Sequence, residues 1–176
     1  MTAAKRGAKR SADSIAAATA AATRAEGHTR RERRSAGAST PLLAGYVVRD
    51  FALETPLLAV DIGNTDTVVG RFIADELDES WRISSSRTTT DEIRLALEAM
   101  LKTGAAGCPS VLCSVVPAQT RPWAEALRSL TGRDTLQVSA ATSPVPLQVT
   151  EPDSVGPDRI ANALAGRVLH GSPCII

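Results

Sequence analysis

The 176-residue chain is poor in aromatic residues and lacks any long apolar run. Phenylalanine, tryptophan and tyrosine together make up 3% of the residues, so we do not expect a platform that stacks nucleic-acid bases. No apolar run approaches the roughly 18 residues that would indicate a membrane span. The net charge of +1 gives no overall electrostatic reason to bind nucleic acid. We therefore expect no membrane partner and consider a nucleic-acid partner unlikely.

Cysteine is also scarce. The three cysteines, Cys108, Cys113 and Cys174, form neither a Cys-x-x-Cys motif nor a cysteine–histidine pattern typical of a metal site. Cys113 and Cys174 stand in apolar, strand-like segments, where cysteine usually serves as a small buried hydrophobic residue. An odd number of cysteines without a signal peptide favours a reducing compartment, so we expect a cytoplasmic protein.

The first 40 residues differ in composition from the rest of the chain. They contain nine lysines and arginines against three acidic residues, with alanine, serine and threonine between them. Segments of this kind can be organelle transit peptides, disordered tails that contact polyanions, or extensions from a misassigned start codon. Because no apolar periodicity here could build a core, we expect residues 1–56 to form a basic, disordered extension and linker.

Beyond residue 56 the hydrophobic pattern predicts an α/β domain. The first three apolar runs are separated only by short polar turns, which is typical of an antiparallel meander. The fourth is a continuous apolar run between Pro109 and Pro117, as in the central strand of a parallel sheet. Together these runs predict a mixed sheet in a layered α/β structure. The expected strands are 57–62, 67–72, 80–84, 111–116 and 136–138.

Three helices are expected between and after these strands. Thr89 and Glu92 form a capping box that opens the first helix. The second covers residues 121–130, with Pro122 near its start. The third begins after Gly156, and a further apolar strand is expected at its far end, at 173–176. The buried stripe of the third helix is expected to contain Ile160, Ala161, Leu164, Ala165, Val168 and Leu169.

The polar turn after the first strand has the composition of a phosphate-binding loop. Asp61 stands near the end of the strand, and Gly63, Asn64 and Thr65 follow it. Backbone N–H groups in such a turn can point at phosphate oxygens, because glycine has no Cβ to block the approach. An aspartate beside them can hold Mg²⁺ directly or through water. The alternative is an ordinary hairpin turn, which uses the same residue types.

A second polar cluster, Gly156, Pro157, Asp158 and Arg159, stands at the start of the third helix. Asp158 could accept a proton from a substrate hydroxyl, and the planar guanidinium of Arg159 suits an anionic substrate. Such groups fit phosphoryl transfer, where the protein mostly positions groups and neutralises charge. The alternative is that Asp158 only follows the preference of acids for helix N-termini and that Arg159 is solvated.

Taken together, these segments resemble the type III pantothenate kinase family, over about residues 57–176 and in the family's order. The resemblance implies a ribonuclease H-like mixed α/β sheet of the acetate-and-sugar-kinase/actin superfamily. It also implies a first domain at 57–140 and the start of a second, incomplete domain at 141–176. The stretches that carry it are 58–68 (LAVDIGNTDTV), 80–84 (SWRIS), 114–117 (SVVP) and 155–163 (VGPDRIANA).

The family's activity is ATP-dependent phosphorylation of pantothenate to 4'-phosphopantothenate, the first step of coenzyme A biosynthesis. The resemblance implies that Asp158 accepts the proton, that Arg159 faces the pantothenate carboxylate and that Asp61 lies near Mg²⁺. It also implies a monovalent cation, K⁺ or NH₄⁺, and a homodimer in full-length members. The implied ATP segment comprises Asp61, Ile62, Gly63, Asn64, Thr65, Asp66, Thr67 and Val68. The implied pantothenate segment comprises Gly156, Pro157, Asp158 and Arg159.

The chain departs from the family's pattern in three respects. Val149 stands where the family has a tyrosine that contacts pantothenate, and Pro157 replaces the usual alanine. The family's Asp-x-Gly-Thr segment, which supplies the aspartate for the monovalent cation, is not among these 176 residues. We therefore expect an incomplete site with little or no kinase activity from these residues alone, because one wall of a cleft cannot exclude water.

Two alternatives remain open. One is a non-catalytic or transcription-accessory relative on the same fold, whose basic arm touches nucleic acid. Salt-sensitive DNA binding that disappears without residues 1–40 would indicate it. The other is a different sugar- or acetate-kinase-like phosphotransferase, which a substrate panel would separate.

Overall fold

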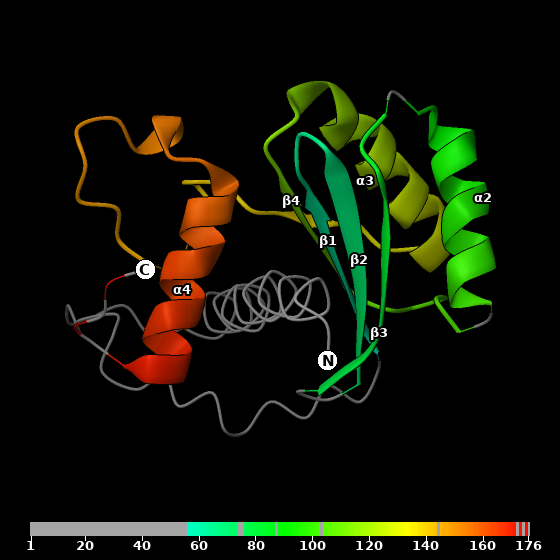
Figure 1. Cartoon of the computed structure of the whole chain (residues 1–176), viewed down its shortest axis with the longest axis horizontal. Coiled ribbons are helices and arrows are strands. Elements are labelled where there is room, and N and C mark those ends of the chain that lie inside the picture. Colours follow the sequence, from blue (N-terminus) through cyan, green and yellow to red (C-terminus); the bar gives the residue numbers. More distant parts are fainter. Residues whose placement is uncertain are drawn as a thin grey trace, which may run out of the picture.

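The computed structural model describes residues 56–73, 76–86, 88–102, 104–143, 145–171, 173 and 175. The predicted basic extension lies outside these residues except for Pro56, and so does Cys174. Helices and strands carry the labels shown in Figure 1.

A five-stranded mixed sheet forms the centre of the fold, in the order β3-β2-β1-β4-β5 (Figure 1). The pairs β1–β2 and β2–β3 are antiparallel, whereas β1–β4 and β4–β5 are parallel. The strands are β1 (Leu57–Ile62), β2 (Asp66–Ile73), β3 (Glu76–Ser84), β4 (Ser110–Ser114) and β5 (Leu136–Gln137). The expected α/β fold, with an antiparallel meander followed by parallel strands, is confirmed.

Helices cover both faces of this sheet (Figure 1). On one face lie α2 (Thr90–Leu101) and α3 (Pro117–Thr131). On the other lies α4 (Pro157–His170), which follows the short 3-10 helix η2 (Pro152–Ser154). None of the helices in the described ranges is both long enough and apolar enough to cross a membrane.

The central strand β1 contributes to two hydrophobic cores, because its side chains alternate between the two faces. Leu58, Val60 and Ile62 pack with α2 and α3, whereas Leu57 and Ala59 pack on the side of α4. Full burial of each large side chain stabilises the fold by about 1.5–3 kcal/mol. The core beside α4 also contains Phe72, Val111, Cys113, Val138, Ile160, Ala161 and Leu164. The chain on both sides of residue 140 thus shares one core, and the division into two domains there stays a prediction.

The capping box predicted at the start of α2 is present. The Glu92 backbone N–H donates to the Thr89 hydroxyl at 3.3 Å, and the Thr89 backbone N–H donates to the Glu92 carboxylate at 2.8 Å. The backbone hydrogen bond, and after it the hydrogen bond from the Thr89 hydroxyl, lower the pKa of Glu92. This exchange satisfies N–H groups that have no partner within the helix.

Replacing Thr89 with alanine is expected to destabilise the chain by about 1 kcal/mol, measured by urea unfolding at pH 7. Since the folded pKa of Glu92 lies below its ordinary value of 4.5, the contribution of this carboxylate is fully present above that value. It is lost as the pH falls through the folded pKa, so the difference between variant and parent should shrink in acid.

Thr88→Ala is the matched control for this substitution. The Thr88 hydroxyl donates to the Ser86 carbonyl, outside the helix, so its loss should cost less stability than the loss of Thr89. Equal losses in the two variants would contradict a capping role for Thr89.

The predicted start of the second helix is wrong. α3 begins at Pro117 rather than at residue 121, because proline fits the first position of a helix, where its N–H is not needed. Ser114 also holds this start: its hydroxyl accepts hydrogen bonds from the Val116 N–H at 3.2 Å and the Thr120 hydroxyl at 2.9 Å. Pro122 lies inside the helix instead of at its beginning.

One further prediction near the end of the chain is wrong. Leu169 is 60% exposed, because the part of α4 that packs on the neighbouring core ends with Val168. The strand expected at 173–176 lies partly outside the described residues, at positions 174 and 176, and the described Pro173 and Ile175 are not in a strand.

Candidate functional site

Polar segments lie at the edge of the sheet where the parallel strands β1 and β4 end. The turn between β1 and β2 and the start of α3 both lie at this edge, at the top of Figure 1. α4 also begins in the upper half of the same view. In open α/β sheets, ligands bind outside the carboxyl ends of the parallel strands. This edge is therefore the candidate site.

The turn after β1 is tight and favours glycine at its first position. The Gly63 N–H donates to the Asp66 carbonyl at 3.0 Å. A Cβ on Gly63 would lie 3.0 Å from that carbonyl oxygen, tighter than nine in ten real Cβ contacts, so the backbone at Asp66 would have to shift by a few tenths of an ångström. Asn64 and Thr65, at the tip of the turn, are exposed. The tip of the turn is thus open to solvent.

The end of the turn is tied to β3. Asp66 forms an ion pair with Arg82, with 2.7 Å between Oδ2 and Nη1. The Thr67 hydroxyl is fully buried and lies 2.8 Å from the Ser85 hydroxyl, while the Ser85 N–H donates to the Thr65 carbonyl at 2.9 Å. These contacts shape the turn and occupy the side chains of Asp66 and Thr67.

The other members of the predicted ATP segment lie in the strands. Ile62 and Val68 are buried, so only their backbones could contribute to a ligand site. Asp61 pairs in register with Val68 on β2 and with Cys113 on β4. Because side chains alternate along a strand, Asp61 shares the face of Leu57 and Ala59, which is the face covered by α4.

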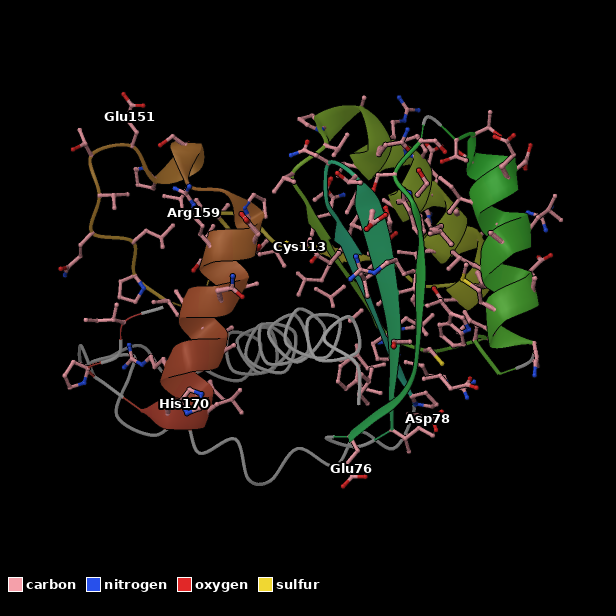
Figure 2. The ribbon with its side chains drawn as sticks, viewed as in Figure 1. Glu76, Asp78, Cys113, Glu151, Arg159 and His170 are labelled. Carbon is pink, nitrogen blue, oxygen red and sulfur yellow. The ribbon has the colours of Figure 1, made fainter. Side chains whose placement is uncertain are left out.

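The predicted pantothenate segment forms the first turn of α4. The N–H groups of Arg159 and Ile160 donate to the Gly156 carbonyl at 3.0 and 3.2 Å. A Cβ on Gly156 would lie 2.5 Å from Asp158 Oδ1, so the carboxyl group occupies space that any other residue at 156 would fill. Asp158 and Arg159 are exposed, and Figure 2 shows Arg159 near the start of α4, at the opposite end from His170.

Cys113 lies beside Asp61 in the parallel register of β4 with β1, on the face of the sheet that α4 covers. It has 0% exposure and lies between the sheet and α4 (Figure 2). Burial raises the pKa of its thiol above the ordinary value, and the negative charges of Asp61 and Asp158 raise it further. Asp61 on β1 and Asp158 in the first turn of α4 are thus associated with the same face of the sheet.

Three residues with contacts at this edge were not identified from the sequence as site residues. Arg82 and Ser85 hold the turn, and Cys113 adjoins Asp61. The serines and threonines that follow the third strand were a weak indication that Ser85 contacts the turn. Cys113 was interpreted as a buried hydrophobic residue, which is confirmed, but its proximity to Asp61 depends on parallel strand register.

No group of three or more histidine, cysteine, aspartate or glutamate side chains within the described ranges could hold a metal ion. This donor set still fits Mg²⁺, which is usually bound by one or two carboxylates together with substrate phosphates and water. Asp61 supplies one carboxylate beside a turn with exposed backbone. A separate pocket between α3 and β5, lined by residues such as Arg121, Glu125 and Gln137, contains none of the predicted site residues.

Comparison with known proteins assigns the described region to one family. The family model described as "Type III pantothenate kinase" matches residues 57–176. Proteins named type III pantothenate kinase are similar to this chain, with 38% identity in Parafrankia sp. (strain EAN1pec) and 37% in Frankia alni. The matches cover 68% of this chain but 48% and 49% of those relatives. The chain thus spans about half the length of the curated relatives it matches.

Among solved structures, a chain of a PilM-PilN type IV pilus biogenesis complex is similar, with 15% identity and a TM-score of 0.46. The match covers 69% of this chain and 48% of that one. The likeness is too distant to bear on function. The mixed α/β sheet with helices on both faces agrees with the ribonuclease H-like fold of the acetate-and-sugar-kinase/actin superfamily. The family match over residues 57–176 shows that the chain belongs to the type III pantothenate kinase family.

Proposed function

We propose that this chain contributes the ATP-phosphate and pantothenate segments of an enzyme that phosphorylates pantothenate to 4'-phosphopantothenate. Family membership supports the reaction. The observation that supports the site is that Asp61 lies on the face of the sheet covered by α4, while Asp158 stands in the first turn of α4. The proposed partners are pantothenate, ATP, a monovalent cation and a second subunit, in the cytoplasm.

In this proposal the turn after β1 binds the phosphates of ATP. The tip at Asn64 and Thr65 is exposed, and Gly63 lets the turn close tightly on the Asp66 carbonyl, so the phosphates would meet the turn at its tip. Asp61 would hold Mg²⁺, and a bound Mg²⁺ would neutralise phosphate charge. The contacts of Arg82 and Ser85 fix the shape of the turn before ATP arrives, so less ordering is needed on binding.

The start of α4 would bind and activate the second substrate. Arg159 is exposed in the first helical turn, where its guanidinium can pair with the pantothenate carboxylate. Asp158 would accept the proton of the hydroxyl group that attacks the γ-phosphate. The positive end of the helix dipole adds attraction for an anionic substrate at this position.

The described residues form one side of such a site. Asn64, Thr65, Asp158 and Arg159 are all exposed, so this side alone does not exclude water. We expect turnover of the chain to lie well below the roughly 1–100 s⁻¹ typical of kinases. Turnover in that range would contradict this expectation.

Calorimetric titration of the full chain tests the proposal directly. Pantothenate and Mg·ATP should each bind, and pantothenate should bind better than other short hydroxylated acids in a substrate panel. Substitution of Arg159 by alanine should weaken pantothenate binding and leave Mg·ATP binding unchanged. Absence of binding of both ligands would reject the proposal for this chain.

Replacing Asp61 with asparagine is expected to weaken Mg·ATP binding at least about tenfold, because a carboxylate near the metal is lost. Pantothenate binding should not change. Asp91→Asn is the control, since Asp91 is an exposed carboxylate in the first turn of α2, outside both proposed segments. Equal weakening by both substitutions, or none by Asp61→Asn, would contradict the role of Asp61.

A further inference from the structure

Arg82 lies on β3 with its side chain on the same face of the sheet as Asp61. Its chain neighbours Trp81 and Ile83 pack against the core beside α2 and α3. Because side chains alternate along a strand, the Arg82 side chain lies on the opposite face, the one that α4 covers further along the sheet. The strand pairing agrees, since Val68 on β2 is the register partner both of Arg82 and of Asp61.

Arg82 and Asp61 are thus separated by a single strand. Neighbouring strands lie about 4.8 Å apart, so the backbones of the two residues lie about 10 Å apart across the sheet. Val68, between them, is buried and has an apolar side chain. Because the arginine side chain is long, its guanidinium can reach a phosphate group that is bound beside Asp61.

The sheet face beside Arg82 is open to solvent. Ser80, Arg82 and Ser84 alternate along β3 on this face, and all three are exposed. The Arg82 side chain is 47% exposed. α4 packs against β4, on the other side of β1 from this strand. A ligand can therefore reach the guanidinium of Arg82 from solvent.

The ion pair with Asp66 does not use the full binding capacity of Arg82. Nη1 donates to Asp66 Oδ2 at 2.7 Å, and a guanidinium has five N–H groups. An ion pair as exposed as this one adds little to stability. It does fix the direction of the guanidinium beside the turn after β1. The planar fork of an arginine is well suited to binding phosphate oxygens through two parallel N–H groups.

We propose that Arg82 binds a phosphate group of ATP, while Asp66 orients its guanidinium at the end of the turn. This inference rests on the proposed function, which places the phosphates at the same turn, and it assigns them a contact on β3. The alternative is that Arg82 acts only through Asp66, by fixing the shape of the turn.

Titration calorimetry of the full chain with Mg·ATP, and separately with inorganic tripolyphosphate, tests the contact. Arg82→Gln should weaken the binding of both about tenfold, because a charge-assisted hydrogen bond to phosphate is lost. Arg94→Gln is the matched control. Arg94 also forms one ion pair through Nη1, with Glu98, but it stands on α2, which packs on the other face of the sheet. The control should bind both ligands as the parent chain does.

The Asp66→Asn background distinguishes direct contact from action through the turn. If Arg82 binds phosphate, Arg82→Gln should still weaken Mg·ATP binding at least about threefold in this background, because the phosphate contact is lost there too. If Arg82 acts only through Asp66, the second substitution should have no further effect. Absence of a further loss would overturn the proposal. Urea unfolding of the single and double variants shows whether the fold is intact.

The same titrations separate this inference from the proposed function. If the parent binds Mg·ATP and Arg82→Gln binds it equally well, the role of Arg82 is rejected although the function stands. If the parent binds tripolyphosphate in a manner that depends on Arg82 but does not bind Mg·ATP, the phosphate contact is supported and the function is rejected. If the parent binds neither ligand, both are rejected.

Discussion

In a form of the protein that carries the rest of the site, Asp158→Asn is expected to phosphorylate pantothenate about 10²- to 10⁴-fold more slowly than the unsubstituted protein and to bind Mg·ATP equally well. Asparagine has nearly the shape of aspartate but cannot accept the hydroxyl proton as a carboxylate does. Because Asp158 is exposed and asparagine is tolerated near helix N-termini, the fold should not change. The loss would then report proton transfer rather than stability.

The measurement must detect slow turnover. The protein, in excess over ATP, is incubated with pantothenate, so that each protein molecule reacts at most once. Mass spectrometry then measures the 4'-phosphopantothenate that has formed. Asp153→Asn is the matched control, because Asp153 is an exposed carboxylate in η2, shortly before the helix. The control should keep the parental rate. A parental rate in Asp158→Asn would remove this residue from the proposed mechanism.

Replacing Gly156 with alanine is expected to lower the same rate about 10²-fold, because it displaces the group that takes the proton. The backbone of Gly156 has a φ of −58°, which alanine adopts without strain. The added Cβ, however, would lie 2.5 Å from Asp158 Oδ1, so the carboxyl group must move. The end of a side chain can move at little cost, and stability should fall by at most about 1 kcal/mol.

Pro157→Ala serves as the control for Gly156→Ala, since it changes the neighbouring position and adds no atom near Asp158. It should keep most of the activity, and alanine is also the residue usual in the family at this position. Thermal unfolding of all three proteins shows whether the fold is intact. An unchanged rate in Gly156→Ala would mean that the position of Asp158 over Gly156 has no part in the reaction.

Local sequence signals predicted most of the fold. The apolar run of β1 and the capping box of Thr89 and Glu92 depend only on neighbouring residues, and both are as expected. The start of α3 was not predicted, because Pro117 and Pro122 are each compatible with a helix start. Leu169 fitted the helical period, yet exposure depends on where the opposing core ends.

The candidate site was predictable only as two separate segments. Asp61 and Asp158 were singled out by residue type and local context, but their approach to Cys113 follows from parallel strand register and from the packing of α4. Neither can be derived from the spacing between residues. The contacts of Arg82 and Ser85 with the turn arise in the same way, from the pairing of β2 with β3. Their roles in a reaction stay predictions.

The two edge strands of the sheet, β3 and β5, affect how readily the protein pairs with other copies of itself. Within the described residues, β5 has only two residues, and β3 exposes four charged side chains, Glu76, Asp78, Glu79 and Arg82. Unpaired backbone groups on an edge strand can pair with strands of other molecules. A short edge strand, or charged side chains on it, makes such pairing less favourable. Amyloid-like stacking is therefore disfavoured at both margins of the described sheet.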